Sequence, residues 1–170
     1  MDYLNIIGQA LGIVAVVLGF LNYQVKEAKS ILIIQLITCA VFCAHYLLIG
    51  AISAFALNAV GVVRNIVYYK RNSETVWGKV CPVVFAVIMG AMGILSWQNI
   101  FSGFVVAGLV INTVCLCLRS ADGIRKSILV SSPMVLIYNI TELSIGGIIY
   151  ESVAIISAII GIVKYRKNCK

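Results

Sequence analysis

The chain has 170 residues, of which 62% are hydrophobic and 11% charged, and its 13 Lys and Arg against 6 Asp and Glu give a net charge of +7. Soluble domains are about half apolar and a quarter charged, so this composition excludes a water-soluble globule and a disordered chain. An integral membrane protein remains, and we interpret its positive charge as the Lys and Arg of cytoplasmic loops, not as a nucleic-acid surface.

Seven apolar runs, separated by short polar breaks, predict seven transmembrane helices. The runs are Leu4–Tyr23, Ile31–Ile49, Ile52–Tyr69, Val80–Trp97, Phe101–Leu118, Ser127–Ile140 and Ile145–Val163. A spanning helix needs about 20 residues, so little chain is left for a domain outside the bilayer. The first run has no basic residue before it, and we interpret it as an uncleaved span. Pro133 predicts a kink in the short sixth run.

Basic residues alternate between the breaks. Lys and Arg follow spans one, three, five and seven, whereas the breaks after spans two, four and six contain none. Because cytoplasmic loops of membrane proteins are enriched in Lys and Arg, the N-terminus is predicted outside and the C-terminus in the cytoplasm.

A shift of 96 residues aligns Tyr69-Lys70-Arg71-Asn72 with Tyr165-Arg166-Lys167-Asn168. We interpret the chain, residues 1–170, as a single transmembrane domain with repeat one at about 4–72, a linker helix at about 80–97 and repeat two at about 101–168. The shift covers an even number of spans, so equivalent helices point the same way and the repeat is parallel.

Several short polar motifs lie within the spans and at their ends. They are His45-Tyr46-Leu47-Leu48-Ile49-Gly50, Ser53-Ala54, Asn58-Ala59, Arg64, Tyr138-Asn139, Ser144-Ile145-Gly146-Gly147 and Glu151. These motifs make the chain similar to the YgjV family of bacterial inner-membrane proteins. The three-plus-one-plus-three arrangement also resembles SWEET and PQ-loop transporters. The resemblance implies an all-α, SWEET-like fold of seven helices in the bacterial inner membrane, and it carries no activity with it. The proline hinge of SWEET proteins is not implied, since spans one, two and five lack proline.

Two charged residues lie inside the predicted spans, where a charge at the bilayer centre costs about 2.5–3.5 kcal/mol. Arg64 lies near the cytoplasmic end of span three. It either extends to the lipid headgroups or forms the cationic end of a cavity. Glu151 lies near the outer end of span seven. It is either a carboxylate at the outer interface or part of a site.

His45 is the one histidine, and it lies five residues before Gly50, as Glu151 lies five residues after Gly146. The simpler interpretation of His45 is a hydrogen-bonded packing residue. The alternative is that His45 and Glu151 face each other as an outer gate between the repeats, within hydrogen-bond or one-water reach, because pairing lowers the cost of burying both.

Amides form a second polar feature of the spans. Asn58, Gly61 and Asn65 share one face of span three. Such amides either join helices by hydrogen bonds or line a polar cavity. On the second interpretation the residues that bind the substrate are Asn58, Arg64, Asn112, Tyr138 and Asn139. The Gly8–Gly12 GxxxG motif is typical of tight helix packing within one chain. The six cysteines are interpreted as small apolar residues, with no metal site.

Function is predicted as transport of a small polar solute across the inner membrane by alternating access between the two repeats. The alternative is a non-transporting membrane protein: a sensor, a receptor or an assembly factor. An enzyme is not expected, because the sequence contains no paired carboxylates, nucleophile–base pair or metal cluster. The expected partners are the lipid bilayer and an unknown small polar solute, without nucleic acid or cofactor. A homodimer is left open.

Overall fold

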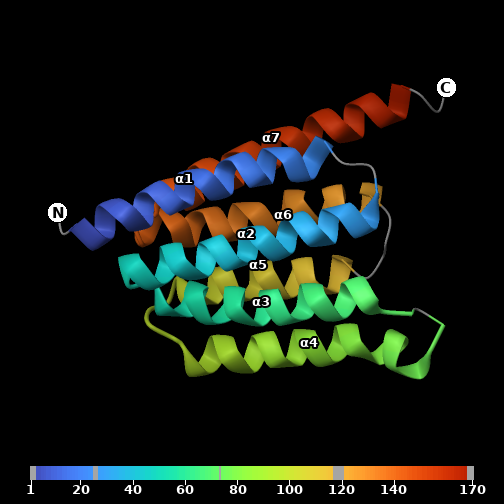
Figure 1. Ribbon diagram of the computed structural model, residues 1–170, viewed down its shortest axis with the longest axis horizontal. Helices are drawn as coiled ribbons and strands as arrows, with labels where there is room; N and C mark the ends of the chain where they lie inside the picture. Colours follow the sequence, from blue (N-terminus) through green and yellow to red (C-terminus); the bar gives the residue numbers. More distant parts are fainter. Residues whose placement is uncertain (1–2, 25–26, 73, 117–120, 168–170) are drawn as a thin grey trace.

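The computed structural model describes residues 3–24, 27–72, 74–116 and 121–167, and these residues contain helices and turns but no strands. The described residues form seven helices, which follow one another along the chain (Figure 1). They are α1 (Tyr3–Gln24), α2 (Ala28–Ile49), α3 (Ile52–Lys70), α4 (Val76–Leu95), α5 (Ser102–Cys115), α6 (Ala121–Thr141) and α7 (Ile145–Lys167). The predicted all-helical class is confirmed.

Within the described residues, four helices are long and apolar enough to cross a membrane. Their apolar stretches are Tyr3–Asn22, Lys29–Ile49, Ile52–Lys70 and Val76–Leu95, and shorter ones occupy Ser102–Cys115 and Ile145–Ile160. Large hydrophobic side chains such as Ile7, Val87 and Ile156 are more than half exposed on the outside of the bundle. Exposed apolar surface of this extent belongs against lipid, because water would penalise it.

Among the helix starts, the largest differences from the predicted runs are at α4 and α6, which begin at Val76 and Ala121, before the predicted Val80 and Ser127. The Oγ1 of Thr75 accepts a hydrogen bond from the backbone N–H of Gly78 at 3.0 Å and so caps α4. Helix α6 begins at Ala121 and continues through Pro133 to Thr141, although its first turns are polar. Hydropathy measures the apolar length of a helix, so it omits polar turns at the ends. The kink at Pro133 stays a prediction.

Six helices form a closed ring in the order α1, α2, α3, α5, α6, α7, with α7 packed against α1. Helix α4 lies outside this ring, against α3 and α5 (Figure 1). The contact between α3 and α5 is the least extensive in the ring. Met89 of α4 is 1% exposed and its sulfur lies 2.9 Å from Oγ1 of Thr113 on α5. Helix α4 therefore covers the seam that α3 and α5 leave.

The ring closes where α1 meets α7. A Cβ atom added to Gly146 would lie 2.3 Å from the Cα of Gly12, and one added to Gly12 would lie 2.8 Å from the Cα of Gly146. Neither position has room for a side chain, because the neighbouring atoms are backbone. The Gly8–Gly12 motif thus serves packing within the chain, as predicted.

The turns alternate between two ends of the bundle (Figure 1). We call the end with the turns 50–51, 96–101 and 142–144 the Gly50 end, and the opposite end, where α1, α3, α5 and α7 finish, the Lys70 end. The described N- and C-terminal helix ends lie at opposite ends of the bundle. Apart from Arg64, every Lys and Arg that the structure describes belongs to the Lys70 end.

Candidate functional site

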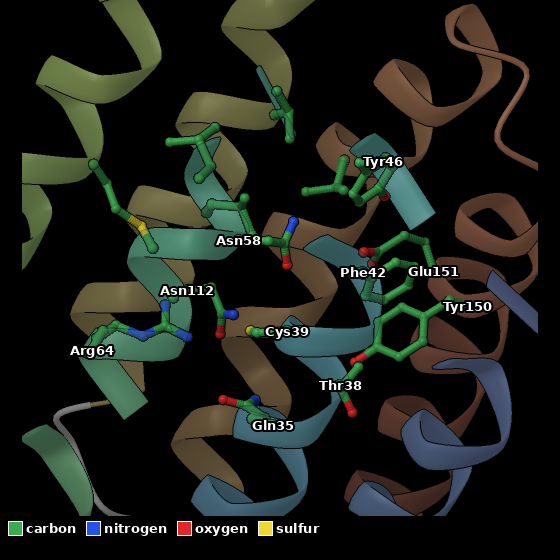
Figure 2. Close-up of a pocket in the computed structure, with 16 residues that line it drawn as sticks. Gln35, Thr38, Cys39, Phe42, Tyr46, Asn58, Arg64, Asn112, Tyr150 and Glu151 are labelled. Atoms are coloured by element: carbon green, nitrogen blue, oxygen red, sulfur yellow. The ribbon is translucent and has the colours of Figure 1, made fainter. Parts of the chain in front are cut away.

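A cavity lies inside the helix ring (Figure 2). Its empty volume is about 610 Å³ when the open space at its entrance is included. The centres of water molecules can occupy about 70 Å³ of this volume. Since one water needs roughly 10–15 Å³ by that measure, several waters or one small solute fit. Helices α2, α3, α5, α6 and α7 line it, with Met89 from α4. Its polar lining residues are Gln35, Thr38, Asn58, Arg64, Asn112 and Glu151.

Arg64 is held within the bundle. Its side chain is 2% exposed. Its Nη1 donates to Oγ1 of Thr113 on α5 at 2.7 Å, and its Nε and Nη2 donate to Oδ1 of Asn65 at 3.3 and 3.1 Å. The guanidinium is therefore oriented by α3 and α5 together and lies in the cavity wall, which favours the cavity interpretation over extension to the headgroups.

Two amide oxygens in the wall have no hydrogen-bond partner among the described residues. Oε1 of Gln35 and Oδ1 of Asn112 are buried and accept no hydrogen bond from the part of the chain that the structure describes. An unsatisfied buried polar atom costs about 1–3 kcal/mol, so native proteins normally supply water or a ligand there. Both atoms therefore indicate a wet or ligand-binding cavity.

Asn58 is half-buried, and its Nδ2 donates to the carbonyl oxygen of Ala54 at 2.9 Å. Figure 2 shows its side chain pointing into the cavity, with Arg64 and Glu151 on opposite sides. The sequence prediction that Asn58, Arg64 and Asn112 face one space is thus met by their geometry, while their binding role stays a prediction.

Glu151 is 9% exposed, and the Ser132 hydroxyl on α6 hydrogen-bonds to its carboxyl group. It makes no ion pair with any residue that the structure describes. Three rings lie beside it in the cavity wall (Figure 2). The Phe42 centroid is 5.0 Å from that of Tyr150, edge to face, and 5.3 Å from that of Tyr46, stacked. We call Phe42, Tyr46 and Tyr150 the aromatic cluster.

His45 does not make the predicted contact with Glu151. Its Nδ1 lies 2.7 Å from the carbonyl oxygen of Gly8 and its Nε2 lies 2.6 Å from Oγ of Ser144. A carbonyl only accepts, so Nδ1 donates, and in the neutral ring Nε2 accepts from Ser144. Counting residues from Gly50 and Gly146 assumed that both turns lie at one level. Instead, Ser144, the residue before α7, lies level with His45. Glu151 lies about 10 Å further along α7, away from the Gly50 end.

The profile of the YgjV family, described as a bacterial inner membrane protein family, matches residues 6–169. The chain belongs to this family. No curated protein and no solved structure matches it. The family description agrees with the apolar helices, and it confirms the predicted membership and the bacterial inner membrane as the family's location.

Two predicted binding residues of this YgjV-family protein lie outside the cavity lining. Tyr138 is fully buried in the core, and Oδ1 of Asn139 accepts a hydrogen bond from the Tyr46 hydroxyl at 2.7 Å. Gly147 leaves room for this amide, since a Cβ there would lie 2.6 Å from its Cγ. Asn139 thus positions one ring of the aromatic cluster from behind, and direct binding by either residue stays a prediction.

The sequence interpretation missed Gln35 and the aromatic cluster. Gln35 is a lone amide in an apolar run, without another amide at helical spacing. The aromatic side chains were missed because an inward-facing ring and a lipid-facing ring look alike in an apolar sequence. Polarity inside a span therefore revealed part of the cavity wall, and the tertiary fold was needed for the rest.

Proposed function

We propose that this protein carries a small polar solute across the bacterial inner membrane by alternating access between two three-helix repeats. The observation that carries the proposal is the cavity inside the ring, lined from both halves of the chain, with a buried Arg64, a buried Glu151 and unsatisfied amide oxygens. Ionisable residues inside membrane spans are costly, and they are characteristic of substrate and ion pathways. Carriers also place their sites at the interface between repeats.

The pattern of helix contacts supports two repeats. Helices α1, α2 and α3 pack in sequence, and so do α5, α6 and α7. Two contacts join the halves, α1 with α7 and α3 with α5. If α1, α2 and α3 are equivalent to α5, α6 and α7, exchanging the two halves turns each of these contacts into the other. This pattern supports the proposal of a parallel repeat with α4 as linker, as in the SWEET arrangement. Seven spans with the N-terminus outside complete the proposal, from the basic residues at the Lys70 end.

A second candidate, a receptor or sensor with a fixed binding site, is favoured by the Gly50 end. There the α1 and α7 backbones touch at Gly12 and Gly146, and His45 joins both helices to α2. A carrier must separate these contacts in its outward-open state, whereas a sensor can keep them. Both functions use the same cavity and differ in whether the solute passes through.

The proposal is tested by binding followed by flux. Purified protein is screened by thermal shift against amino acids, sugars, polyamines and organic acids, and each compound that raises Tm is tested for uptake into proteoliposomes. We expect saturable uptake that Asn112→Leu reduces at least about tenfold, while Asn5→Leu, a matched amide on α1 outside the cavity, leaves it unchanged. Binding without uptake would favour the fixed sensor.

A further inference from the structure

Opposite charges face the cavity from the two halves of the chain. Arg64 belongs to α3 and Glu151 to α7, both are buried, and Figure 2 shows them on opposite sides of the space. The low-dielectric interior penalises a buried ion that has no opposite charge close by. Since Glu151 makes no ion pair within the described part of the chain, a ligand is the natural source of its partner.

The Arg64 side is suited to a carboxylate. The guanidinium is planar, and the hydrogen bonds to Asn65 and Thr113 fix its orientation. A guanidinium binds carboxylates through two parallel N–H bonds, and that geometry requires such fixing. The amides of Gln35 and Asn112 line the cavity as well, and each can present a donor or an acceptor to a polar ligand.

The Glu151 side is suited to an ammonium group. A carboxyl group supplies the negative charge, and the aromatic cluster supplies ring faces, which attract cations through their quadrupoles. Asn139 fixes the Tyr46 ring by accepting its hydroxyl hydrogen bond at 2.7 Å, so part of this wall is pre-organised. An anion would be repelled here, and a neutral polyol would leave the carboxylate without a counter-charge.

Resting on the proposed role of the cavity as the solute site, we propose that the solute is a small zwitterion, with its carboxylate at Arg64 and its ammonium group between Glu151 and the aromatic cluster. The ammonium group of the ligand then compensates Glu151, and its carboxylate accepts hydrogen bonds from the oriented Arg64 guanidinium. The cavity has room for several waters, which limits the ligand to one short chain between its two charged groups.

The experiment measures binding of an ω-amino acid series to the purified full-length chain in nanodiscs by calorimetry. The series is glycine, β-alanine, 4-aminobutyrate and 6-aminohexanoate, with butylamine, butyrate and glycerol as probes that lack one charge or both. We expect one zwitterion to bind at least about tenfold more tightly than butylamine, butyrate and glycerol. The length that binds best then reports the distance between the two charged subsites.

Charge variants assign each end of the ligand. Glu151→Gln should weaken the best zwitterion at least about tenfold and leave butyrate unchanged, while Arg64→Gln should weaken it similarly and leave butylamine unchanged. Arg64→Lys keeps the charge without the planar fork and should cause an intermediate loss, which keeps the test valid if Arg64→Gln does not fold. The matched control is Glu142→Gln, because Glu142 lies at the Gly50 end, bonded to Asn99 and outside the cavity lining.

The outcomes separate this inference from the proposed function. If no zwitterion binds, if glycerol or butylamine binds as tightly, or if Glu151→Gln has no more effect than Glu142→Gln, the zwitterion site is rejected, and transport of another solute is still open to the uptake screen. If the zwitterion binds as predicted but does not accumulate in proteoliposomes, the site is supported and the carrier is rejected.

Discussion

At the Gly50 end, the side chains of His45 and Gln9 are satisfied by polar groups from other helices and turns. His45 bonds to Gly8 and Ser144, and the amide of Gln9 donates to the carbonyl of Leu143 at 3.0 Å and accepts from the N–H of Ile145 at 3.1 Å. In the cavity, by contrast, the buried oxygens of Gln35 and Asn112 have no partner among the described residues. The same residue types thus stabilise the fold at one place and lower its stability at the other.

This difference separates structural from functional polarity inside a membrane protein. A satisfied network contributes to stability, and cutting it leaves a partner unpaired. An unsatisfied amide in a cavity lowers stability, so we infer that it is kept for binding. The following changes are ordered by the size of the effect that this distinction predicts.

The largest effect is expected where α1 and α7 touch. Gly146→Val places side-chain atoms against the Gly12 backbone, which cannot yield without separating the helices. We expect a loss of about 3 kcal/mol or more, measured as a reduced Tm and loss of monodisperse protein in detergent. Gly90→Ala is the matched control, because nothing lies within 4 Å of its new Cβ. An unchanged Tm for Gly146→Val would show that the ring does not depend on this contact.

Removal of the His45 ring should have the next largest effect. His45→Ala leaves the Gly8 carbonyl and the Ser144 hydroxyl without their partner, at a cost of about 2–3 kcal/mol. A double-mutant cycle with Ser144→Ala should give a coupling energy of at least about 0.5 kcal/mol. Simple additivity of the two substitutions would contradict the observed contact.

The smallest change in stability, and one of opposite sign, is expected in the cavity. Asn112→Leu removes an unsatisfied oxygen and should leave the free energy of unfolding unchanged or raise it by up to about 1 kcal/mol. The same substitution at Asn139 should lower it by about 1 kcal/mol, because the Tyr46 hydroxyl loses its acceptor, and this loss outweighs the removal of Nδ2 of Asn139, which has no partner among the described residues. Equal destabilisation by both would remove the distinction between the two regions.

The sequence predicted the helices well because lipid requires each span to be long and apolar. It placed the starts of α4 and α6 too late, because Thr75 caps one helix and the first turns of the other are polar. Arg64, Asn58 and Asn112 could be selected because a polar residue in an apolar run is conspicuous.

What the sequence could not predict depends on how the helices are shifted along one another. The partner of His45 was misassigned because levels in different helices cannot be compared by counting residues from turns. Gln35 and the aromatic cluster were missed because hydropathy does not distinguish a cavity-facing side chain from a lipid-facing one. Both failures concern how the helices are placed relative to one another, and the periodicity within one helix carries no information about that placement.

The central claim is that the cavity opens alternately to the two sides of the membrane. Labelling of Cys39, a native free cysteine in the cavity wall, tests this claim directly. A variant that keeps Cys39 and replaces the other five cysteines is labelled in right-side-out and inside-out vesicles with a membrane-impermeant methanethiosulfonate. We predict modification from both sides, faster from the Lys70 end because the Gly50 end is closed by hydrogen bonds, and slower in the presence of the best-binding zwitterion. Modification from one side only, or from neither, would contradict alternating access.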